Sequence, residues 1–87
     1  MKIAVVHWAD ANYQVADGSI KDVHGPIELY SVGWLAKEDD ECITIAMELS
    51  HGGDEGRFWL TIPRVNVIEV RTIDPDRMKK TTRRKAC

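Results

Sequence analysis

The residue types that support catalysis are present in this sequence, but they form no catalytic pattern. His7, His24 and His51 are spread along the chain without ligand spacing, and no cysteine lies at a zinc interval from any of them. Cys42 opens an apolar run directly after an acidic segment, where neighbouring negative charge disfavours the reactive thiolate. The sequence lacks the motifs of serine nucleophiles, phosphate-binding loops, zinc proteases and dinucleotide sites. We therefore predict that the protein is not an enzyme and has neither a cofactor nor a metal site.

The three tryptophans, Trp8, Trp34 and Trp59, are the residues best suited to binding. In the alternation of their segments, Trp34 and Trp59 fall opposite the expected core face. An outward indole needs something to pack on, and the ordinary cover is a long loop or a second subunit. A flat ligand is the alternative, because nucleotide bases stack on aromatic faces.

Two arginines flank the fourth apolar segment. Arg57 follows a glycine-rich stretch, and Arg64 follows Pro63. Guanidinium groups bind phosphate or carboxylate through paired hydrogen bonds, and a glycine-rich tip can add an anion-binding nest of backbone N–H groups. Arginines in loops are more often simply solvated. The predicted binding set for a small anionic, nucleotide-like ligand is Trp8, Trp34, Arg57, Trp59 and Arg64.

The formal charge of the chain is unevenly distributed. Residues 1–72 hold six Lys or Arg against twelve Asp or Glu, whereas residues 73–87 hold six against two. The body is therefore acidic and the tail is basic. Such a tail can contact nucleic acid, pair with the acidic body, or serve only as a solvated end.

Length and composition predict one small domain. A chain of 87 residues is near the lower limit for a single apolar core. We expect the domain to cover residues 1–72, with a flexible basic tail over 73–87. Cys42 and Cys87 suggest no disulfide framework, and residues 3–8 are too short for a signal peptide or a membrane span. These features favour a cytoplasmic protein without a membrane partner.

Hydrophobic alternation predicts an all-β fold of five antiparallel strands. The expected strands cover residues 3–8, 27–37, 42–49, 58–62 and 67–72. Gly33 inside the second strand indicates a sharp bend, a bulge or a close backbone approach. The long loop over residues 10–26 needs cover that so small a core hardly supplies, so we expect a homo-oligomer. Five short strands with one strongly bent predict a small curved barrel.

The ordered series of residues 31–35 (SVGWL), the acidic turn at 38–41, an apolar strand and Ile62-Pro63-Arg64 resembles a group of short phage and prophage proteins without an assigned activity. The resemblance covers residues 28–70. It implies a protein of an infected bacterial host's cytoplasm with an accessory role, such as inhibiting host defence by sequestering a nucleotide signal. The layout is also similar to Sm-like and SH3-like small barrels, a fold analogy that carries no function.

From these features we expect a non-enzymatic binding protein that sequesters a small nucleotide-like ligand. One alternative is a nucleic-acid-associated, Sm-like regulator that uses the basic tail. The other is a protein that inhibits a host enzyme by direct contact through its tryptophan face.

Overall fold

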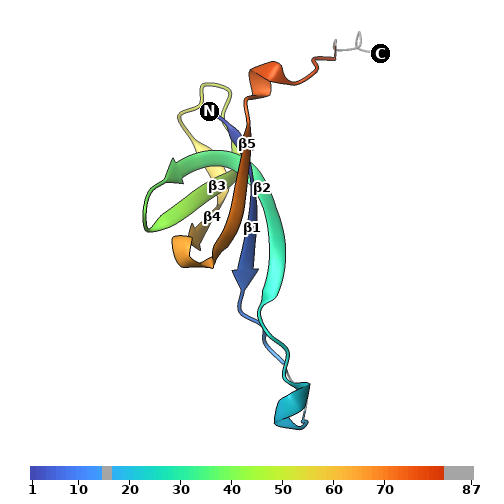
Figure 1. Ribbon diagram of the computed structural model, residues 1–87. Helices are drawn as coiled ribbons and strands as arrows, with labels where there is room; N and C mark the ends of the chain where they lie inside the picture. Colours follow the sequence, from blue (N-terminus) through green and yellow to red (C-terminus); the bar gives the residue numbers. More distant parts are fainter. Residues whose placement is uncertain (15–16, 82–87) are drawn as a thin grey trace, which may run out of the picture.

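The computed structural model describes residues 1–14 and 17–81 of the chain and contains one antiparallel sheet (Figure 1). The strands are β1 (Ile3–Asp10), β2 (Ile27–Glu38), β3 (Cys42–Leu49), β4 (Gly56–Pro63) and β5 (Val67–Ile73). Three short 3-10 turns accompany them: η1 (Ile20–Asp22), η2 (Arg64–Asn66) and η3 (Pro75–Arg77). The predicted all-β class is confirmed, and no predicted strand boundary is wrong by more than two residues.

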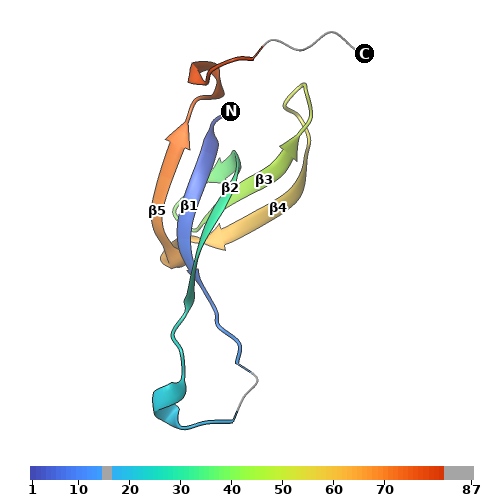
Figure 2. The ribbon, with the colours of Figure 1, turned by 90° about the vertical axis from the view of Figure 1, so that its right-hand side faces the viewer.

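The sheet is strongly curved but open. Its strand order is β4-β3-β2-β1-β5, and among the described residues the two edge strands, β4 and β5, do not pair with each other. The closed barrel expected from the sequence is therefore only partly present. Strand number, direction and curvature agree with it, whereas closure is absent (Figure 2).

Gly33 marks the point where β2 leaves β3. A side chain at this position would place its Cβ 2.6 Å from the carbonyl oxygen of Ala46, so only glycine fits. Before Gly33, β2 pairs only with β1. From Trp34 onward it also pairs with β3, with a register shift between Leu35 and Lys37. The predicted close backbone approach at Gly33 is confirmed.

The core lies on the inner face of the curve. Alternate residues of β1 point into it, and they meet side chains of β3 and β4. The buried cluster consists of Ala4, Val6, Trp8, Ile43, Ile45 and Ile62. Alternation along residues 42–49 predicts that Met47 lies in this core with Ile43 and Ile45, but Met47 is 70% exposed. Met47 follows Ala46, the last residue of β3 that pairs with β2 among the described residues.

Two segments leave the sheet at opposite ends (Figures 1 and 2). The arm, described over residues 11–14 and 17–26, extends β1 and β2 away from the body and contains η1. The other end begins with η3, where the side chain of Asp74 accepts a hydrogen bond from Asp76 N and so caps the turn. Asp74 followed by Pro75 predicts one helical turn from the sequence, and η3 is this turn. Residues 82–87, including Cys87 and half of the basic tail, lie outside the described part of the chain.

In the described part of the chain, no helix is long and apolar enough to cross a membrane.

Candidate functional site

The outer face of the sheet carries an apolar row that crosses all five strands. Directly paired residues of antiparallel strands point to the same face, and five of them follow one another across the sheet. This outer row is Trp59 (β4), Ala46 (β3), Trp34 (β2), Ile3 (β1) and Ile73 (β5). Trp59 is 54% exposed and Ile73 is 46% exposed, whereas Trp34 and Ile3 are half-buried. Ala46, in the middle of the row, is fully buried, so neighbouring side chains cover it.

Gly56 makes room for Trp59. A Cβ at position 56 would lie 2.8 Å from Cζ2 of the Trp59 indole, so the ring extends over this glycine. Between them, Phe58 has a φ of 57°, a left-handed conformation that bulky residues rarely adopt. The pairing register of β4 with β3 is the same on both sides of Phe58, since Arg57 pairs with Glu48 and Trp59 pairs with Ala46.

A second aromatic pair extends the outer face along β1 and β2. The rings of His7 and Tyr30 stack with their centroids 4.5 Å apart and their planes 16° apart. His7 Nε2 lies 2.8 Å from Glu28 Oε1, which holds the imidazole in this position. Val5 and Val32 pair directly between this stack and the outer row. The outer face is therefore apolar or aromatic from Trp34 to Tyr30.

Trp8 is separated from the other two tryptophans. It belongs to the inner core with 8% of its surface exposed, and its indole N–H donates a hydrogen bond to Ser31 Oγ at 2.9 Å. Its one polar atom is thus satisfied inside the fold. This position serves the core and leaves no face of Trp8 open for stacking.

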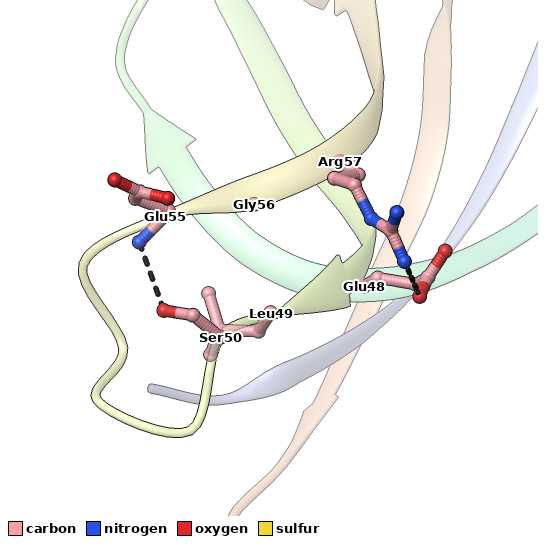
Figure 3. Close-up of a pocket in the computed structure, with 6 residues that line it drawn as sticks. All are labelled: Glu48, Leu49, Ser50, Glu55, Gly56 and Arg57. Carbon is pink, nitrogen blue, oxygen red and sulfur yellow. Dashed lines mark hydrogen bonds and ion pairs between the residues drawn. The ribbon is translucent and has the colours of Figure 1, made fainter.

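The glycine-rich tip between β3 and β4 uses its own backbone donors internally (Figure 3). Ser50 N donates to Glu55 O, Gly53 N donates to Ser50 O, and Glu55 N donates to Ser50 Oγ. The adjoining hollow of about 210 Å3 is lined by Glu48 and Glu55 as well as by Arg57. An anion that binds Arg57 here must therefore displace Glu48 from the guanidinium. The N–H groups of Ser50, Gly53 and Glu55 are therefore not available to an anion-binding nest at this tip.

Both predicted binding arginines lie in exposed ion pairs. Arg57 donates to Glu48 Oε2 at 2.7 Å, with its guanidinium 5.9 Å from the centre of the Phe58 ring. Arg64 donates to Glu38 Oε2 at 3.3 Å. The two arginines flank opposite ends of β4, about 23 Å apart along an extended strand. This distance is too long for both arginines to bind one small ligand.

The predicted residues therefore separate into three places. Trp34 and Trp59 share the outer row, and Arg57 lies two residues from Trp59 on the same strand. Trp8 is in the core, and Arg64 is at the far end of β4. Sequence analysis missed Ile3, Ala46 and Ile73 as members of the row, because only strand register shows that they are neighbours. Among the described residues, no group of three or more His, Cys, Asp or Glu side chains converges as a metal site.

Comparison of the chain with protein-family models, curated proteins and solved structures finds no match.

Proposed function

We propose that this protein is a non-enzymatic binding protein whose outer sheet face holds a small, flat, anionic ligand of the nucleotide class. The observation that carries the proposal is the shared row of Trp34 and Trp59, which flank Ala46 on one face of the sheet. The backbones of Trp34 and Trp59 are two strand spacings, or about 10 Å, apart. At this distance the two indoles and the side chains that bury Ala46 between them form one surface. Nucleotide bases stack on a surface of this kind, and the stacking depends little on which base is bound.

Arg57 supplies the anion-binding group in this proposal. Its ion pair with Glu48 is exposed on both sides, with 72% of the Arg57 side chain and 46% of the Glu48 side chain accessible. Exposed pairs of this kind contribute about 0–1 kcal/mol, so a phosphate can replace the carboxylate at low cost. The phosphate then gains paired, charge-assisted hydrogen bonds from the guanidinium. The proposed site comprises Trp34, Trp59 and Arg57, and leaves out Trp8 and Arg64.

The biological setting of the proposal comes from the resemblance to short phage and prophage proteins. A binding protein without catalytic groups acts stoichiometrically, by lowering the free concentration of its ligand. Sequestration of a nucleotide immune signal in an infected bacterial cell is the accessory role that suits such a protein.

Native mass spectrometry of the protein purified gently from bacterial cells, followed by titration with nucleotides, tests this proposal. We expect a bound small mass and a dissociation constant that rises about tenfold or more in Trp59→Ala. Arg57→Ala weakens phosphate-bearing ligands in particular. Arg71→Ala is the matched control, because Arg71 forms a similarly exposed 2.7 Å pair with Glu69 on β5. A bare protein that binds no nucleotide overturns the proposal.

A protein partner is the second candidate for the same face. The outer row continues from the tryptophans to Ile3 and Ile73, which is further than one nucleotide reaches. Long apolar stretches with exposed tryptophans are typical of protein interfaces. Substitution Ile73→Asp separates the two candidates, since it disrupts a protein interface along the row but leaves nucleotide stacking on Trp34 and Trp59 intact.

Nucleic-acid binding through the tail is the remaining candidate. Arg77, Lys79 and Lys80 are exposed, and within the described residues they form no ion pair. Nucleic-acid binding that disappears on deletion of residues 74–87, and that weakens steeply with salt, supports this function. Binding that survives the deletion contradicts it.

A further inference from the structure

The arm carries large apolar side chains that its own body does not cover. Tyr13 is 88% exposed, Ile20 is 92% exposed and Val23 is 69% exposed. The radius of gyration of the chain is 17.6 Å, whereas a compact chain of this length has about 12 Å. The described residues therefore form an extended molecule in which the apolar side chains of the arm stay exposed.

The arm nevertheless has a defined internal structure. Asn12 Nδ2 donates to Gly25 O at 3.1 Å, and His24 N donates to Gln14 Oε1 at 2.7 Å. Asp22 N donates to Ser19 O at 2.8 Å and closes η1. These bonds connect the two sides of the arm, so Tyr13, Ile20 and Val23 lie beside hydrogen-bonded residues in its described part.

The opposite end of the molecule is chemically complementary to the arm. A hollow of about 300 Å3 is lined there by Lys2, Thr72, Ile73, Asp74 and Arg77. Lys79 and Lys80 follow directly, and the neighbouring Met78 is 51% exposed. Lys2, Arg77, Lys79 and Lys80 outnumber Asp74 and Asp76 here, so this end combines a net positive charge with exposed apolar surface.

The arm combines exposed apolar surface with the opposite charge. It carries Asp17 and Asp22 against Lys21, and within the described residues neither aspartate forms an ion pair. Opposite charges placed across an interface fix its orientation and suppress wrong partners.

The two complementary ends cannot meet within one chain. They lie at opposite ends of a molecule whose longest dimension is 60 Å (Figures 1 and 2). A second copy in the antiparallel orientation supplies both missing partners at once, because each arm then reaches the other copy's basic end. Such a reciprocal arrangement closes on itself as a two-fold dimer.

We propose that two copies of this chain form an antiparallel dimer in which the arm of each packs on the C-terminal end of the other. Ile20 and Val23 of one copy pack near Ile73 and Met78 of its partner, and the arm aspartates face the basic residues. This interface does not depend on the proposed nucleotide site, which uses Trp34, Trp59 and Arg57.

Sedimentation equilibrium of the full chain, in low and high salt, tests the dimer by charge exchange. One variant combines Asp17→Lys with Asp22→Lys, and a second combines Arg77→Glu, Lys79→Glu and Lys80→Glu. Each variant alone raises the dimer dissociation constant by about a hundredfold or more, because like charges then face each other. The variant that carries all five substitutions restores association.

The matched control for the arm variant combines Asp40→Lys with Glu41→Lys in the β2–β3 turn. It changes the net charge by the same amount without touching either end, and it leaves the dimer intact. Circular dichroism of each variant confirms that the strands still form. A wild-type chain that stays monomeric, or a dimer that both reversals leave unchanged, overturns the proposal.

Discussion

On the inner face of the sheet Val6, Ile43 and Ile62 are fully buried, whereas on the outer face Trp59 and Tyr30 keep more than half of their surface exposed. Both faces carry apolar side chains, but among the described residues they are covered more completely on the inner face. Apolar surface stabilises a fold in proportion to the area removed from water. The inner face therefore provides stability, while the outer face contributes little to it and is free to bind a partner.

The largest effect is expected from the inner face. Ile62→Ala removes a fully buried side chain from β4 and leaves a cavity among Ile43, Ile45 and Val6. We expect the free energy of unfolding to fall by about 2–5 kcal/mol, measured by urea denaturation. A loss below 1 kcal/mol would show that this face is not the stabilising core.

A smaller loss of stability is expected from a substitution at Gly33, where β2 separates from β3. Gly33→Ala places a Cβ 2.6 Å from a backbone carbonyl of β3, so β2 or β3 must shift. We expect unfolding to become easier by about 1–3 kcal/mol. Gly25→Ala is the control, because no atom lies within 4 Å of a Cβ at that position. Equal effects of the two substitutions would contradict the close approach at Gly33.

The smallest effect on stability is expected from a substitution in the β2–β3 turn, which lies on neither face of the sheet. The backbone N–H groups of Cys42 and Glu41 donate to Asp39 Oδ1 and lower the pKa of this carboxyl below its usual 3.8. Because the pKa is lowered in the folded state, the ionised carboxylate stabilises the protein above pH 3.8. This contribution is lost as the pH falls through the folded pKa.

Asp39→Asn therefore lowers the melting temperature slightly at neutral pH and has no effect at a pH well below 3.8. Asp40→Asn serves as the control, since the Asp40 side chain makes no hydrogen bond among the described residues. The same melting difference at both pH values would exclude the turn hydrogen bonds as its cause.

The strands were predictable from the sequence because local signals define them. A β-rich apolar run in residues 3–8, alternation in residues 42–49, and glycine or proline at the turns indicated the five segments with few errors. Gly33 was predictable as a special backbone position, because a glycine inside a strand needs a structural reason.

Sheet closure and the outer row were not predictable in the same way. Ile3, Trp34 and Ile73 become neighbours through strand register, which depends on pairing between distant segments. The partners of Arg57 and Arg64 also depend on this pairing, as Glu48 and Glu38 come from other strands. Trp8 was misleading for a simpler reason, since an isolated indole in a strand gives no sign of which side is covered.

The most direct test of the division between the two faces compares Trp59→Ala with Ile62→Ala, two substitutions on the same strand. For Trp59→Ala, we expect the free energy of unfolding to change by less than about 1 kcal/mol, because the side chain is exposed. Nucleotide binding, measured on the same samples, should weaken about tenfold or more. A Trp59→Ala protein that loses as much stability as Ile62→Ala, or that binds nucleotide like the wild type, would contradict a binding role for the outer face.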